Sequence, residues 1–190
     1  MATIEVREVN GITLPPAGKY EFDKAHTAIG FVARHMLTKV RGRFMAFDGS
    51  VQIGQRPEDS KVRVDVDLSS VTTGNEKRDD HLRSGDFFET EQHPTMTFSS
   101  TAVRVGEGEG FEIDGTLTVK DVTNPLTLQA RFDGWGPGMQ EGSTVAAFSA
   151  TATIDREDWD LTWNMAVETG GVLVSKQIEI EIDAELLLVG

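Results

Sequence analysis

The sequence predicts an all-β protein whose antiparallel strands close into a barrel. Apolar and polar residues alternate with a period of two over several long runs, glycine- or proline-bearing turns separate the runs, and few segments favour helix. Tall strands with one apolar face each bury that face most economically when the sheet closes on itself. An eight-stranded barrel has room inside for side chains or for one elongated ligand. A two-sheet sandwich is the structural alternative.

The strands are defined by this alternation. The run VRVDVDL at 62–68 places three valines and a leucine on one face and charged residues on the other. The same pattern recurs at 111–119, 126–132 and 148–154. The last run, 177–189, keeps one phase for about a dozen residues and would span about 40 Å at roughly 3.3 Å per residue. The sheet must therefore be tall.

Turns and short helices interrupt the alternation. GEGEG at 106–110, TNP at 123–125 and GWGPGMQEG at 134–142 read as turns between successive strands of a meander. DKAHTAIGF predicts a short helical turn capped by Asp23, and NEKRDDHLRSG predicts a helix capped by Asn75. We expect these one or two short helices near the barrel rim.

Length and charge limit the classes of protein. The 190 residues fit one domain, which we place at 19–190, with residues 1–18 as an N-terminal arm that ends in the turn-like LPPAG. The formal net charge of −13 disfavours binding to nucleic acid or to an anionic membrane surface. Between Lys24 and Phe47, however, the chain has five basic residues and no acidic one.

Cysteine usage and the N-terminus limit the chemistry and the compartment. The absence of cysteine excludes disulfides, thiolate metal sites and a cysteine nucleophile. Glu5, Arg7 and Glu8 interrupt the apolar run that a signal peptide requires, and no window reaches the length of a membrane span. The sequence therefore predicts a cytoplasmic protein without an integral membrane segment.

Five segments, in order, carry a family resemblance. They are YEFDKAHTAIGFVARHM, VRGRFMAFDGSV, VDLSSVTTGNEKRDDHLRSGDFFETEQHPTMTFSS, GTLTVKDVTNPLTL and ATIDREDWDLTWN, and they fall within residues 19–189. The most specific piece is NEKRDDHLRSGDFF with HPTMTF behind it. Together they resemble the YceI-like family of polyisoprenoid-binding proteins.

The resemblance implies a lipocalin-like barrel that holds a long isoprenoid lipid, often as a homodimer and without known catalysis. Many members of the family are exported behind a signal peptide, and this sequence departs from them there. It also has Trp159 and Asp160 where the family often has phenylalanine and glycine. That difference bears on the closed end of the pocket.

Aromatic and sulfur-containing side chains are our candidates for the wall of the barrel interior, because a methyl-branched chain requires apolar but adaptable surroundings. The candidates are Phe31, Phe44, Met96, Phe98, Phe148 and Trp163. In IGFVARHM, His35 shares the apolar phase of its strand, so it is either a satisfied core histidine or a donor to a lipid head group. The same alternatives apply to His26.

The charged segment around 78 also has two interpretations. Arg78 and His81 suit the phosphate or quinone oxygens of a head group. Alternatively, Arg78 and Asp79 pair with neighbours and seat the helix on the rim, while Phe87 and Phe88 anchor the segment in the core and on the wall. The sequence favours the structural interpretation, because adjacent helical positions diverge around the helix axis.

The predicted function is non-catalytic binding, storage or transport of a long isoprenoid lipid, either a polyprenyl phosphate or an isoprenoid quinone. The alternatives are a carrier of another amphiphile, such as a fatty acid or fatty amide, and an enzyme that uses His35 or His81 on a lipid head group. The sequence has no nucleophile elbow or strongly spaced metal ligands. Glu89, Glu91 and His93 are spaced to share one strand face, but Pro94 follows them. We therefore predict no metal, no cofactor and no catalysis.

Overall fold

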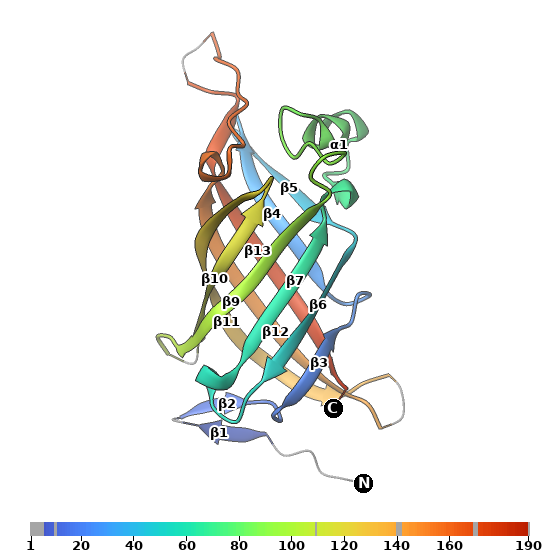
Figure 1. Cartoon of the computed structure of the whole chain (residues 1–190), viewed down its shortest axis with the longest axis vertical. Helices are drawn as coiled ribbons and strands as arrows, with labels where there is room; N and C mark the ends of the chain where they lie inside the picture. The colour runs from blue at the N-terminus through green and yellow to red at the C-terminus, as the bar shows by residue number, and fades with distance from the viewer. Residues whose placement is uncertain (1–5, 10, 109, 140–141, 169–170, 190) are drawn as a thin grey trace.

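A computed structural model describes residues 6–9, 11–108, 110–139, 142–168 and 171–189. The described chain forms a tall antiparallel barrel whose strands run obliquely around one axis (Figure 1). Eight strands are hydrogen-bonded in a closed ring: β3 (Gly18–Phe22), β6 (Phe47–Ile53), β7 (Lys61–Asp67), β9 (Thr95–Val105), β10 (Gly110–Val119), β11 (Val122–Pro137), β12 (Thr144–Asp155) and β13 (Val174–Leu188). The predicted eight-stranded barrel is confirmed, and the sandwich alternative is wrong.

Three further strands extend the ring. β4 (Ala28–His35) pairs with the N-terminal part of β13, whose C-terminal end pairs with β3. β5 (Thr38–Phe44) pairs with β4, and its end pairs with β8 (Val71–Thr72). β3 and β4 thus form one interrupted strand beside β13. β5 and β6 form the next interrupted strand, beside β4 and β3 respectively.

The break between β3 and β4 corrects one prediction. The Oδ1 atom of Asp23 accepts a hydrogen bond from the Ala25 amide at 2.9 Å, but no helix follows and β4 begins at Ala28. The segment is a capped turn, because Glu185 of β13 holds both of its ends. The Glu185 carbonyl accepts from the Asp23 amide at 2.8 Å, and the Glu185 amide donates to the Thr27 hydroxyl at 3.1 Å.

The hairpin turns agree only in part with the sequence. The expected turn at 106–110 is confirmed, because β9 ends at Val105 and β10 begins at Gly110. The expected turn at 123–125 is wrong, since those residues lie inside β11. The turn lies at Lys120 and Asp121, whose φ angles of 50° and 64° match the twist of a two-residue hairpin. Likewise, 134–137 of the expected turn at 134–142 lie inside β11, and residues 140 and 141 lie outside the described residues.

The helices are short and lie between strands. α1 (Glu76–Arg83) stands at the upper end of the barrel in Figure 1. The Asn75 side chain accepts a hydrogen bond from the Arg78 amide at 3.1 Å, so the predicted cap is confirmed. The single turns of 3₁₀ helix are η1 (Pro57–Asp59), η2 (Leu68–Ser70) and η3 (Arg156–Trp159).

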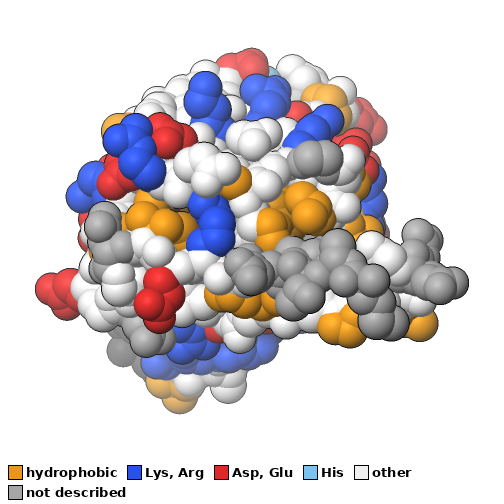
Figure 2. Space-filling model, turned by 90° about the horizontal axis from the view of Figure 1, so that it is seen from below, with side chains coloured by type: hydrophobic (Ala, Val, Ile, Leu, Met, Phe, Trp, Pro, Cys, Tyr) orange, Lys and Arg blue, Asp and Glu red, His pale blue; other side chains and the backbone are white. Residues whose placement is uncertain are grey.

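A two-stranded hairpin, β1 (Arg7–Val9) and β2 (Ile12–Leu14), lies against the lower end of the barrel (Figure 1). Ile12 and Leu14 are buried against the barrel residues Val103, Phe111 and Ala130. The Arg7 guanidinium donates to the carbonyls of Pro15, Gly54 and Gln55. Part of the predicted N-terminal arm is therefore packed on the barrel. Figure 2 shows this end, where apolar patches lie among charged side chains.

Candidate ligand cavity inside the barrel

A cavity of about 600 Å³ occupies the barrel interior, a volume typical of pockets for small organic ligands. Leu14 of the hairpin contributes to its lower part, and His81 and Trp163 contribute to its upper part. Between them the wall consists mainly of the inward-facing apolar residues of the ring strands. Such a space favours an elongated apolar molecule over a polar one.

All six predicted wall residues line this cavity: Phe31, Phe44, Met96, Phe98, Phe148 and Trp163. The Phe31 and Phe44 rings lie 5.7 Å apart between centroids, and Phe44 contacts Phe88 at 5.9 Å. Phe98 is buried on β9, and Phe148 contacts Phe132 at 5.2 Å. Their contact with a bound ligand stays a prediction.

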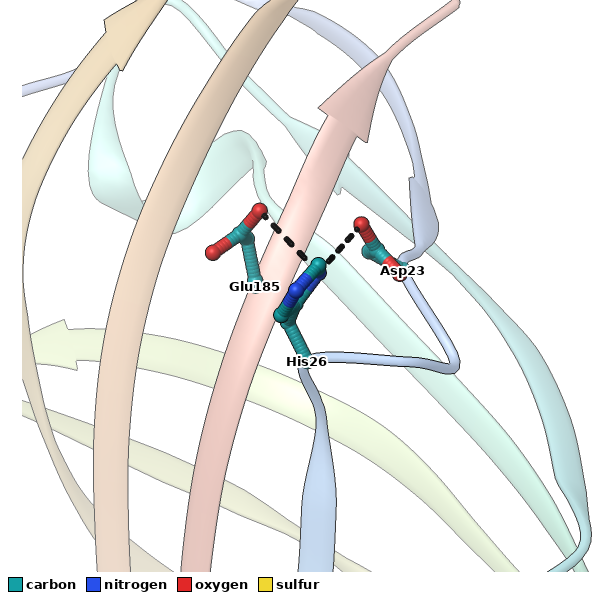
Figure 3. A group of neighbouring side chains, drawn as sticks. All are labelled: Asp23, His26 and Glu185. Carbon is teal, nitrogen blue, oxygen red and sulfur yellow. Dashed lines mark hydrogen bonds and ion pairs between the residues drawn. The ribbon is translucent and has the colours of Figure 1, made fainter. Parts of the chain in front are cut away.

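The candidate histidines His26 and His35 lie in different places. His35 lines the cavity at the end of β4, opposite Val174 of β13. His26 does not line the cavity, because it belongs to the turn between β3 and β4. Its Nδ1 atom lies 2.9 Å from Asp23 Oδ2 and 3.8 Å from Glu185 Oε1 (Figure 3). Its expected contact with a lipid head group therefore lacks a geometric basis.

Among the described residues, Asp23, His26 and Glu185 form the one group that offers a metal ion three neighbouring ligand atoms. Its ligand atoms lie within 4.8 Å of one another. The hydrogen bond between Asp23 and His26 and the capped turn account for the arrangement without an ion. Around the Glu89–His93 segment, Lys120 Nζ lies 3.8 Å from Glu89 and Asp121 lies 3.2 Å from His93. These contacts join the segment to the hairpin turn at 120–121.

The His26 imidazole is expected to titrate above its ordinary pKa of 6.5. The hydrogen bond that the ring donates to Asp23 and the charges of Asp23 and Glu185 all raise this pKa, because they favour the protonated ring. The pairing therefore stabilises the fold below pH 6.5, and this stabilisation is lost as the pH rises through the folded-state pKa. An NMR titration should show the raised pKa in the native protein and its return toward 6.5 in Asp23→Asn. The remote Glu91→Gln variant should leave the pKa unchanged, and an ordinary pKa in the native protein would refute the assignment.

The contacts of α1 support the structural interpretation of its charged residues. The Arg78 guanidinium donates to the hydroxyl and the carbonyl of Thr73 at 2.7 and 3.1 Å. The buried Asp79 carboxylate accepts from the Thr73 amide and from the hydroxyls of Thr72 and Thr73. Arg83 donates to the carbonyls of Ser69 and Val71. These bonds hold α1 on the barrel rim.

The Asp79 carboxyl has a pKa below its ordinary value of 3.8. Burial alone would raise this pKa, but the hydrogen bonds from Thr73 and Thr72 stabilise the carboxylate and outweigh burial. Asp79 therefore remains ionised at neutral pH although it is 5% exposed.

Aromatic rings close the upper part of the cavity. The His81 ring lies 4.4 Å from the Trp163 ring and 5.1 Å from the Phe87 ring, measured between centroids. Its Nε2 atom is 2.8 Å from Asp86 Oδ2, so one ring nitrogen already has a partner. Phe87 and Phe88 both line the cavity, next to Trp163 and Phe44 respectively. The phenylalanine pair thus anchors the segment, as predicted.

The basic segment lies on the outside of β4 and β5. Lys39 and Arg41 form ion pairs with Glu179 and Glu181 of the neighbouring part of β13. Both side chains therefore lie on the outer face of the barrel.

Sequence reasoning missed Arg156. Its side chain lines the cavity and is 3% exposed, although the flanking residues are acidic. The signal was present in the alternation, because Ala150, Ala152 and Ile154 face inward and residue 156 keeps their phase. Close by, Trp159 also lines the cavity and donates from Nε1 to the Leu117 carbonyl at 2.8 Å. Asp160 has a φ of 57°, a left-handed conformation that the glycine common in the family adopts more easily.

A model of the YceI-like domain matches residues 20–186. The chain belongs to the YceI-like family. The UPF0312 protein of Staphylococcus aureus strain N315 is 37% identical over 169 residues, which cover 87% of this chain and 95% of that protein. The YceI protein of Campylobacter jejuni in its crystal structure is 28% identical, with a TM-score of 0.70 over 88% of this chain and 96% of that one.

A more distant structure shares the YceI-like fold. A polyisoprenoid-binding domain from Saccharophagus degradans is 16% identical, with a TM-score of 0.63 over 90% of this chain and 98% of that domain. This likeness shows the fold alone.

Within the described residues, no helix has both the length and the apolar character needed to cross a membrane.

Proposed function

We propose that this protein binds a long-chain isoprenoid-like lipid inside its barrel without transforming it. The observation that carries the proposal is the apolar cavity of about 600 Å³ within a closed ring of strands. Burial of a hydrocarbon chain there contributes about 25 cal/mol per Å² of apolar surface removed from water. The lipid tail would lie among the ring strands and the head group near α1.

Membership of the YceI-like family supports binding of a lipid of this kind. The polyisoprenoid-binding domain of Saccharophagus degradans has the same fold, and we take polyisoprenoids as the ligand class to test first. Among the described residues, neither the His35 nor the His81 imidazole has a hydrogen bond to a hydroxyl group that it could activate, which supports binding rather than catalysis. Storage or transport is the role that such binding would serve.

The first experiment is mass spectrometry of the purified protein under native conditions and again after solvent extraction. The expected result is a mass excess that extraction removes and that matches an isoprenoid lipid. Recovery of a fatty acid or fatty amide would assign the cavity to the alternative amphiphile. A protein that is empty and takes up neither added prenyl lipid nor fatty acid would contradict the proposal. Homodimer formation and cytoplasmic residence stay predictions of the sequence.

A further inference from the structure

The cavity wall has a charge pattern opposite to that of the whole protein. The chain has a formal net charge of −13. Among the described residues that line the cavity, none is acidic, whereas Arg34, Lys77, Arg78 and Arg156 are basic. The wall of the cavity therefore includes basic residues and no acidic residue.

Arg156 is the most deeply buried of these cations. Its Nε atom donates to the Ser175 carbonyl at 2.9 Å, and its Nη1 atom donates to the Leu161 carbonyl. Its Nη2 atom has no partner, and in the described part of the chain it is the one buried side-chain nitrogen or oxygen in this condition. Burial lowers the pKa of this guanidinium, but an arginine stays charged in proteins. The result is a fixed, buried positive charge with one donor left over.

The carboxylates nearest in sequence do not form a salt bridge with this charge. Glu157 pairs with Lys176 at 2.6 Å. The Asp155 side chain accepts from the Glu157 amide at 3.0 Å and so caps η3. Both carboxylates act on the guanidinium only through space, without a direct hydrogen bond to it. A buried charge without a direct ionic partner is costly, so an anion that contacts Arg156 should stabilise the site.

Strand register places Arg156 at the same end of the cavity as His35. Val174 of β13 pairs with His35 of β4, and Gln177 of the same strand pairs with Asp155 of β12. Ser175, whose carbonyl holds Arg156, lies between these two pairs. Arg156 and His35 therefore lie at the upper end of the cavity, opposite the β1–β2 hairpin.

We infer that Arg156 is the recognition point for an oxyanion head group, a phosphate or a carboxylate, on the lipid whose binding is proposed above. The two backbone bonds fix the plane of the guanidinium, and Nη2 donates to one oxygen of the head group. A hydrogen bond between ionised partners in a water-poor site is among the strong ones. The inference rests on the proposed function and adds the charge of the ligand to it.

The test compares charged and neutral forms of one short isoprenoid. Tryptophan fluorescence reports binding, because Trp159 and Trp163 line the cavity. We expect the native protein to bind farnesyl monophosphate at least about tenfold more tightly than farnesol. In Arg156→Gln this preference should vanish, while the affinity for farnesol changes less than about twofold. Arg131→Gln, which removes an exposed arginine that pairs with Asp133, should behave as the native protein does.

Each outcome separates the inference from the proposed function. Equal affinity of the native protein for farnesol and farnesyl monophosphate overturns the inference, whether or not Arg156→Gln folds. An equal loss for both lipids in Arg156→Gln makes Arg156 a structural residue only and also overturns it. Binding of neither lipid overturns the proposed function itself. A comparison of the affinities for palmitate and hexadecanol then decides whether the site also recognises a carboxylate. Binding of inorganic phosphate alone shows whether the isoprenoid chain is required.

Discussion

Replacement of Asp79 with alanine is expected to lower the free energy of unfolding by about 3–5 kcal/mol. The carboxylate is buried and accepts three hydrogen bonds, from the Thr73 amide at 2.8 Å and from the hydroxyls of Thr73 and Thr72 at 2.6 and 3.1 Å. The variant leaves these donors without an acceptor. Urea unfolding followed by tryptophan fluorescence measures the loss.

The neighbouring residue provides the matched control. Asp80 is on the same helix, but its side chain is 69% exposed and its pairing with Arg83 is a surface one. Asp80→Ala should therefore change the free energy of unfolding by about 1 kcal/mol or less. If Asp79→Ala were as stable as Asp80→Ala, Asp79 would not be a residue that holds α1 on the barrel rim.

The pH dependence of the same variant gives a second readout. Because the folded-state pKa of Asp79 is below its ordinary value of 3.8, its contribution is present above that value and is lost as the pH falls through the folded-state pKa. The stability difference between the native protein and Asp79→Ala should therefore be constant near neutral pH and shrink below about pH 4. A difference that stays constant down to pH 2 would mean that the carboxylate charge is not what matters.

Alternation predicted the inward face of the strands because one side of every strand meets the same apolar interior. Val62, Val64 and Val66 line the cavity, as do Phe111 and the residues in phase with it. His35 was placed inside by the same reasoning. A period of two needs no tertiary information, so the inner wall could be predicted from the sequence.

Features set by contacts between distant segments could not be predicted in this way. The turn at 23–27 depends on Glu185, which lies about 160 residues further along the chain. The hairpin at 120–121 was obscured by Pro125, a turn signal that the structure places within a strand. Arg156 was missed because the acidic residues beside it resemble a solvated surface. Arg156 keeps the inward phase of β12 but lies in η3, beyond the end of the strand at Asp155, so the alternation alone did not single it out.

Filling the cavity is expected to abolish binding of a long lipid without unfolding the barrel. Ala150 of β12 lines the cavity, packs on two core clusters and is partly exposed to the interior space. Ala150→Trp puts an indole ring into that space, so a long chain can no longer lie along the barrel axis. We expect the occupancy by a long isoprenoid to fall at least about tenfold, as measured by native mass spectrometry after incubation with the lipid. A short chain that fits above or below the ring should be affected much less.

Thr153→Trp is the matched control, since it adds the same ring on the same strand at an exposed outward position opposite Glu179. It should bind the long lipid as the native protein does. Overpacking could also destabilise Ala150→Trp by about 1–3 kcal/mol, so the free energy of unfolding of both variants must be measured alongside binding. If folded Ala150→Trp retains the long lipid at full occupancy, the lipid does not pass through the barrel centre. The ligand would then lie on the outside, and the cavity would be only a loosely packed core.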